Sequence, residues 1–225
     1  MIKGNLIIGS DMEYRILKKR HLEILLEKVP DYASPKAGLE QYKTPSAIAA
    51  DILWFAYNLG DIHGKHVMDL ACGTGIFAIG AAILGAGKVF AVDIDKEALE
   101  VAVGAAEELG VADRIQFIEA DIRDSIMELS RLKVDTLIQN PPFGSQRMVK
   151  RGADRIFIEG SLRISPVVYS FHMMGSEDFV TGYFERIGGK ITHKLYYRFP
   201  IPRIYNFHKK DFKVVDVIVL RIIRT

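Results

Sequence analysis

The five residues Asn140, Pro141, Pro142, Phe143 and Gly144 follow an apolar run and have side chains suited to chemistry on an amino group. The side-chain oxygen of Asn140 and the carbonyl of Pro141 can accept the two hydrogens of an exocyclic amine or amide, whose nitrogen is otherwise a poor nucleophile. The prolines restrict the backbone and so position these acceptors in advance, and Phe143 offers a ring on which a planar base can stack. The motif therefore predicts a catalytic site for an NH2 group, and a plain turn after a strand is the alternative.

A glycine-rich loop, Gly73-Thr74-Gly75, follows an apolar segment further upstream. Glycines allow a tight turn and let a ligand approach the backbone closely, so the loop indicates a nucleotide-type site. The run GTGIFA from Gly73 to Ala78 also satisfies the dinucleotide fingerprint, with Asp93 suitably placed after the next segment. A nicotinamide-dependent oxidoreductase therefore remains open at this point.

Three acidic residues, Asp69, Asp93 and Asp121, lie at or near the ends of predicted strands. Asp69 would repel a pyrophosphate but favour the sulfonium and amino groups of S-adenosylmethionine. Asp93 can accept hydrogen bonds from two ribose hydroxyls, and Asp121 can accept from an adenine amino group while Ile122 donates its backbone amide. The alternative is that these residues are helix N-caps or turn residues.

The spacing of apolar residues predicts a doubly wound α/β fold with a mostly parallel sheet. Short β-branched segments predict strands at 65–71, 88–94, 115–121 and 134–139, and helical patterns occupy 76–84 and 96–109 between the first three. Further strands are expected at 167–172 and 213–223, with a helix at 176–186. The carboxyl ends of parallel strands would bring the three acidic residues and the Asn140 motif to one edge.

The N-terminal part reads as a helical extension of the same domain, so we expect one domain over 1–225 with the extension at 1–45. A charged amphipathic pattern predicts a helix at 13–29, which Pro30 should end. A polar, turn-rich segment follows, and a second, apolar helix should begin with Thr44 as its N-cap and Pro45 in its first position.

The composition is that of a globular chain, with 49% hydrophobic and 26% charged residues among 225. A net charge of +2 leaves only local patches for binding a polyanion. The single Cys72 has no disulfide partner within the chain, and the first residues have no signal-peptide pattern, so we expect a cytoplasmic protein. No segment reads as membrane-spanning, and no closely spaced His or Cys pair predicts a metal site.

Several segments together resemble one family of amino-methyltransferases, the methyltransferase-like protein five family with its archaeal relatives. These segments are Leu39-Glu40-Gln41-Tyr42 with Thr44-Pro45, residues 69–82, Asp93-Ile94-Asp95, Asn140 to Gly144, Tyr169-Ser170-Phe171-His172, and Asn206 to Lys210. The resemblance covers nearly the whole chain after the first predicted helix.

The resemblance implies a Rossmann-like fold and S-adenosylmethionine-dependent methylation of adenine N6 in small-subunit ribosomal RNA. It also implies that Gln41 and Thr44 close over the methionine part of the cofactor. The residues implied to hold the rest of the cofactor are Asp69, Gly73, Thr74, Gly75, Ile76, Asp93, Asp121 and Ile122. Eukaryotic members work with a small zinc-binding activator protein, which could add a strand to an exposed sheet edge near the glycine loop.

Two basic clusters could contact RNA around a flipped base. Arg147, Lys150 and Arg151 follow the Asn140 motif, and His208, Lys209 and Lys210 lie near the end of the chain. Solvated surface charge explains each cluster equally well. Three alternatives share parts of the pattern: methylation of guanine N2 in RNA, methylation of a glutamine N5 in a protein, and an RNA-binding module without activity.

Overall fold

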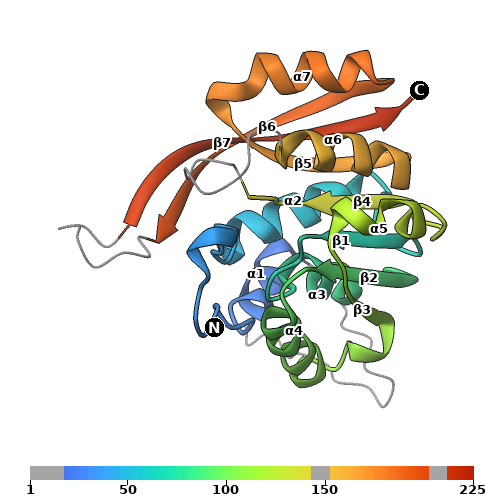
Figure 1. Ribbon diagram of the computed structural model, residues 1–225. Helices are drawn as coiled ribbons and strands as arrows, with labels where there is room; N and C mark the ends of the chain where they lie inside the picture. The colour runs from blue at the N-terminus through green and yellow to red at the C-terminus, as the bar shows by residue number, and fades with distance from the viewer. Residues whose placement is uncertain (1–17, 143–152, 203–211) are drawn as a thin grey trace.

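Seven strands form one sheet in the order β3-β2-β1-β4-β5-β7-β6 in the computed structural model, which describes residues 18–142, 153–202 and 212–225 (Figure 1). The strands are β1 (His66–Leu70), β2 (Lys88–Asp93), β3 (Ile115–Glu119), β4 (Thr136–Gln139), β5 (Val167–Met173), β6 (Gly189–Pro202) and β7 (Phe212–Arg224). β1 to β5 are parallel, whereas β7 is antiparallel to both of its neighbours, β5 and β6. The β6–β7 pair extends beyond the rest of the sheet at the left of Figure 1.

Helices cover both faces of the sheet. One face packs against α1 (Lys19–Leu26), α2 (Ser46–Asn58), α3 (Ile76–Ile83) and α4 (Lys96–Glu108), and the other against α5 (Ile122–Leu129), α6 (Ala153–Ile164) and α7 (Glu177–Arg186). Successive side chains of β2 point to opposite faces of the sheet. Val89 and Ala91 pack in the core on the side of α1 to α4, and Phe90 and Val92 pack in the core on the side of α5 to α7. The predicted mostly parallel, doubly wound α/β fold is confirmed.

Three elements were not predicted from the sequence: α5, α6 and β6. Among the eight residues of α5 only Ile122 and Leu129 are buried, so the helix has a weak apolar stripe. β6 carries prolines and many exposed or half-buried side chains, because it forms one edge of the sheet and pairs with β7 alone among the described strands. The first helix is shorter than predicted, with α1 ending before Pro30 and residues 1–17 outside the described part.

The predicted start of α2 is wrong by one residue. Pro45, with φ −54° and ψ 135°, is the N-cap, and its carbonyl accepts the first helical bond from the Ala49 amide at 2.9 Å. Thr44 therefore lies one position before the cap, and its hydroxyl is free to bond elsewhere. None of the described helices has the length and apolar character needed to cross a membrane.

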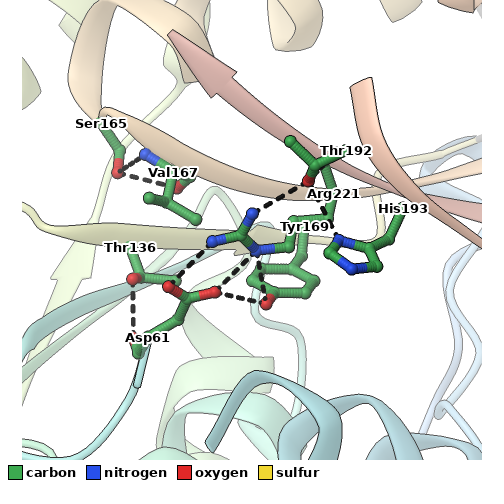
Figure 2. Close-up of polar contacts among 8 residues, drawn as sticks. All are labelled: Asp61, Thr136, Ser165, Val167, Tyr169, Thr192, His193 and Arg221. Atoms are coloured by element: carbon green, nitrogen blue, oxygen red, sulfur yellow. Dashed lines mark hydrogen bonds and ion pairs between the residues drawn. The ribbon is translucent and has the colours of Figure 1, made fainter. Parts of the chain in front are cut away.

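A buried ion pair joins Asp61, in the connection between α2 and β1, to Arg221 on β7 (Figure 2). Arg221 on β7 donates to both carboxylate oxygens of Asp61, through Nε at 2.8 Å and Nη2 at 3.1 Å. The hydroxyl of Tyr169 on β5 donates to the same carboxylate at 2.5 Å, and Thr192 on β6 accepts from Arg221 at 2.9 Å. Thr136 on β4 donates to the Asp61 carbonyl at 2.7 Å, so one aspartate contacts three strands of the sheet.

Candidate active site

A cavity of about 560 Å³ lies at the carboxyl ends of β1 to β4. The loops after these strands form one wall, and the segment 31–45 between α1 and α2, which we call the strap, forms another. The strand order reverses between β1 and β4, and open parallel sheets bind ligands at such a switch point. The cavity size is typical of small-molecule sites.

The glycine loop turns sharply from β1 into α3. Ala71, Gly73 and Gly75 have φ values of 59°, 54° and 84°, in the left-handed region that favours glycine. A Cβ at Gly73 would overlap the hydroxyl of Tyr32 from the strap, and one at Gly75 would lie 2.9 Å from the Ala102 Cβ. Thr74 and Ile76 line the cavity, whereas Gly73 and Gly75 do not and serve the turn itself.

Asp69 lies beneath this loop and does not line the cavity. Its Oδ2 accepts from the backbone amide of Ala78 at 2.8 Å, in the first turn of α3. Since the N-cap of α3 is Gly75, which has no side chain, Asp69 supplies the capping carboxylate from the strand below. Its Oδ1 is buried and has no hydrogen-bond partner among the described residues, and burial raises the pKa of Asp69 to about 7.

Asp93 and Asp121 both line the cavity, but their carboxylates have different partners. Asp93 accepts from the backbone amides of Gly73 at 2.7 Å and Asp95 at 2.9 Å, and burial raises its pKa although these hydrogen bonds oppose the shift. Asp121 is the N-cap of α5 and forms an ion pair with Arg123. The N-cap interpretation is thus correct for Asp121, whereas Asp93 caps no helix and Asp95 caps α4.

The strap is fixed to the β2–α4 turn by polar contacts around Asp95. Gln41 Nε2 donates to Asp95 Oδ2 at 2.6 Å, and Lys36 Nζ donates to Oδ1 at 2.7 Å. The Gln41 side-chain oxygen also accepts from the Lys36 backbone amide at 2.7 Å. Neither Asp95 nor Tyr32 was assigned a role from the sequence. The position of Asp95 just before a helical pattern could have indicated an N-cap. No local pattern indicates that Tyr32 lies against Gly73.

Asn140 follows β4 directly and lines the cavity together with Pro142 and Ile122. Its Nδ2 donates to Thr44 Oγ1 in the strap at 3.0 Å. Its Oδ1 is buried and has no hydrogen-bond partner among the described residues. Pro141 is buried and does not line the cavity. Asn140 thus lies at the cavity wall, and its side-chain nitrogen is bonded to the strap.

Seven of the predicted site residues lie outside the described part of the chain. They are Phe143, Arg147, Lys150, Arg151, His208, Lys209 and Lys210. No group of three or more metal-ligating side chains occurs within residues 18–142, 153–202 and 212–225. His172 is a core residue, since burial lowers its pKa to about 4 and its Nε2 lies 2.7 Å from the Ser170 hydroxyl.

The raised pKa of Asp69 predicts a pH-dependent stability. The folded-state pKa of about 7 lies above the ordinary value for aspartate, so the native state holds more protons than the unfolded state between about pH 4 and 7. The contribution of Asp69 to stability is present at low pH and is lost as the pH rises toward 7. We expect Asp69→Asn to raise Tm at pH 8 and to have much less effect at pH 4, measured by thermal unfolding of the protein without cofactor. An equal effect at both pH values would contradict this cause.

Three features define a Rossmann-like S-adenosylmethionine-dependent methyltransferase: the strand order with a single antiparallel strand at β7, the glycine loop, and Asp93 at the end of β2. A dinucleotide-binding sheet would instead end in the order 4-5-6 without such an inserted strand. Residues 62–158 match the family described as Methyltransferase domain. Solved methyltransferases with S-adenosylmethionine or S-adenosylhomocysteine bound share the fold at 15% and 19% identity, with TM-scores of 0.58 and 0.57.

Closer relatives give a narrower assignment. The chain is 36% identical over 203 residues to the rRNA N(6)-adenosine-methyltransferase METTL5 of Danio rerio, covering 89% of this chain and 95% of the relative. It is 42% identical over 214 residues to an uncharacterized protein of Methanocaldococcus jannaschii, covering 92% and 94%. A crystal structure from Pyrococcus horikoshii, described as an RNA methyltransferase candidate, matches at 36% identity and TM-score 0.81, covering 93% of this chain and 99% of that chain. The chain belongs to the METTL5 family.

S-adenosylmethionine is the cofactor of this class, and the residues at the cavity fit it. The negative charge of Asp93 contributes to the raised pKa of Asp69, and two carboxyl groups near the glycine loop favour a positively charged ligand over a pyrophosphate. Leu70, Val92, Ile94 and Ile122 give the cavity apolar walls suited to an adenine ring. The nicotinamide alternative is therefore excluded by fold, family and local charge together.

Proposed function

We propose that this protein methylates the N6 amine of an adenine in ribosomal RNA. Two observations on Asn140 carry the proposal: the residue lines the cavity, and its side-chain oxygen is buried without a hydrogen-bond partner among the described residues. A buried acceptor without a donor is costly, and an N–H group of the substrate would satisfy it. The relatives named as rRNA N(6)-adenosine-methyltransferases support adenine over the other amines.

We propose that Asn140 and Pro141 of the motif act on the N6 amine of the substrate adenine. Asn140 Oδ1 accepts one of its hydrogens and the carbonyl of Pro141 accepts the other, so electron density on the nitrogen rises toward the methyl donor. Phe143 stacks on the flipped base. S-adenosylmethionine, when bound, supplies an electrophilic methyl group on its sulfonium. No strong base is needed in this arrangement, because the positioned acceptors do the activation.

We propose roles in cofactor binding for the residues that line the cavity and for those in the glycine loop. Asp93 would hold the ribose hydroxyls, and Asp121 with the Ile122 amide would hold the adenine edge. Gln41 and Thr44 would close over the methionine part, since both line the cavity from the strap, which is fixed to the β2–α4 turn through Asp95. Thr74, Ile76 and the glycines Gly73 and Gly75 shape the loop, and Asp69 supplies charge beneath it.

RNA would approach from the side of the Asn140 motif. We propose that six basic residues neutralise phosphates next to the flipped base. They are Arg147, Lys150 and Arg151 after the motif and His208, Lys209 and Lys210 near the end of the chain. A cytoplasmic location, where ribosomal RNA is available, is part of this proposal.

A small zinc-binding activator protein is the proposed protein partner. The glycine loop follows β1, which lies inside the sheet and has a neighbouring strand on each side. On that side of the sheet the edge strand is β3, two strands away from β1, so β3 is the edge that a partner strand could join. β3 pairs with β2 alone among the described strands. A partner strand added to β3 would extend the sheet and cover its exposed backbone groups.

The test is incubation with labelled S-adenosylmethionine and ribosomal RNA, followed by digestion to nucleosides. We expect labelled N6-methyladenosine. Labelled N2-methylguanosine, or label in a glutamine of a protein substrate, would contradict the proposed target. Purification from the native source should also recover a small zinc protein, and full activity and stability of the isolated chain would contradict the need for that partner.

A further inference from the structure

We infer that Tyr32 of the strap is a further cofactor-binding residue, whose phenol forms the cavity wall over Gly73, beside the ribose of S-adenosylmethionine. The inference rests on the role proposed for Asp93 in holding that ribose, and it does not depend on which RNA or which amine is methylated. Three observations lead to it: the inward position of Tyr32, its contact with the glycine loop, and the neighbouring carboxylate of Asp93.

Tyr32 is the one residue between positions 31 and 36 that is not exposed, among those whose burial the structure describes. It is half-buried and lines the cavity, although the chain on either side of it faces solvent. The segment is fixed a few residues later, where Lys36 Nζ donates to Asp95 Oδ1 at 2.7 Å. The strap therefore places a single aromatic ring of this exposed stretch against the cavity.

The hydroxyl of Tyr32 lies where a side chain at position 73 would begin. A Cβ on Gly73 would be 1.9 Å from the Tyr32 hydroxyl oxygen and 2.9 Å from its Cζ, and both distances are far below van der Waals contact. Cys72 and Thr74 on either side line the cavity, whereas Gly73 does not, and the phenol covers it. Gly73 thus has two reasons to be glycine: its φ of 54° and the room that Tyr32 needs.

The same contact brings the phenol to Asp93. Asp93 Oδ2 accepts from the Gly73 backbone amide at 2.7 Å, so the carboxylate and the phenol lie against the same residue. Burial and the negative charge of Asp93 raise the pKa of Tyr32, so the phenol keeps its proton. A ribose hydroxyl can donate to a carboxylate and accept from a phenol at the same time. A ribose held by Asp93 would therefore have Tyr32 as a neighbour in the cavity wall.

The alternative role for Tyr32 is to hold the strap in place without contacting the cofactor. The strap carries Gln41 and Thr44, which are proposed to close over the methionine part. The two roles differ in the part of the cofactor that loses affinity when Tyr32 is removed. Direct contact at the ribose affects every ligand with the adenosine part, whereas a loosened strap affects only ligands with the methionine part.

The experiment measures by calorimetry the binding of S-adenosylhomocysteine and of 5′-methylthioadenosine, which keeps the adenine and ribose but lacks the amino-acid part. We expect Tyr32→Ala to raise Kd by about 10- to 100-fold for both ligands, the usual effect of losing a buried aromatic contact. Tyr32→Phe keeps the ring and should stay within about threefold of wild type. Weaker binding of S-adenosylhomocysteine alone in Tyr32→Ala, or unchanged binding of both ligands, would overturn the inference.

The matched control is Tyr196→Ala on β6. Tyr196 is 55% exposed and does not line the cavity, so both Kd values should stay within about twofold of wild type. Thermal unfolding without ligand verifies that each variant is folded.

A double-mutant cycle tests whether Tyr32 occupies the place over Gly73 in solution. Gly73→Ala should raise the Kd of S-adenosylhomocysteine by at least about tenfold, because the new Cβ displaces the phenol. In the Tyr32→Ala background the same change should add less than about threefold. The strain of alanine at this φ is present in both backgrounds and cancels from the comparison. Equal costs in both backgrounds would overturn the inference.

These measurements need no RNA and no turnover. Failure of the wild-type protein to label RNA would contradict the proposed function, and the two ligands would still report whether Tyr32 contacts the cofactor. If Gly73→Ala does not fold, Tyr32→Ala and Tyr32→Phe with both ligands still decide the inference.

Discussion

Asn140→Ala should lower kcat for RNA methylation by about 100- to 1000-fold, the usual loss when a positioned polar group at a reacting centre is removed. The variant lacks the acceptor that draws a hydrogen of the substrate amine away from the nitrogen lone pair. S-adenosylmethionine affinity should stay within about twofold of wild type, because Asp93 and the strap contacts to Asp95 are unaffected. Single-turnover kinetics and calorimetry measure the two quantities separately.

The matched control is Asn58→Ala at the end of α2. Asn58 is exposed, and within the described residues its side chain donates to the Trp54 carbonyl alone, at 2.8 Å, so its loss should leave the rate unchanged. Asn140→Ala with wild-type turnover would contradict the assignment of the motif. RNA binding by a wild-type protein without any methylation would instead favour the RNA-binding module without activity.

Asp61→Ala should lower the free energy of unfolding by about 3–5 kcal/mol, because the buried guanidinium of Arg221 would lose both of its carboxylate bonds. For a chain of this length the loss corresponds to a decrease in Tm of about 6–20 °C. The hydroxyl of Tyr169 would lose its acceptor in the same variant. Urea unfolding and thermal unfolding of the protein without cofactor check the prediction.

The control for this prediction is the surface ion pair between Lys194 and Glu177 at 2.8 Å, in which Glu177 also accepts from the Tyr196 hydroxyl. Glu177→Ala should lower the free energy of unfolding far less than Asp61→Ala, since solvent screens surface pairs. The double variant Asp61→Leu with Arg221→Met should recover part of the loss, because neither charge is then buried alone. If Asp61→Ala were no more destabilised than Glu177→Ala, the buried pair would have no special role in stability.

Most of the parallel part of the sheet could be predicted because β1, β2, β4 and β5 are largely buried on both faces and therefore contain mostly apolar residues in succession. The predicted strand at 88–94 matches β2, and the helix at 96–109 matches α4 within a residue. β6 could not be predicted in the same way, since an edge strand with half-exposed side chains lacks both a continuous run and a clean alternation.

Those parts of the candidate site could be predicted in which the functional residues are consecutive in the sequence. The Asn140 motif and the glycine loop each occupy a few consecutive residues, and the βα order brings them to one edge. Contacts over long sequence separations were not predictable. Thr44 reads as a helix cap by local rules, yet it bonds to a side chain 96 residues away, and Gln41 bonds to one 54 residues away.

The placement of β7 between β5 and β6 has a consequence for how a nascent chain matures on the ribosome. β6 emerges before β7 but pairs only with β7 among the described strands, so its backbone groups find no neighbour until the later strand arrives. Asp61 likewise cannot form its ion pair until Arg221, 160 residues further along the chain, has been synthesised. Translation must therefore run almost through β7 before β6 can pair and the outer edge of β5 is covered, which exposes strand edges to chaperones during synthesis.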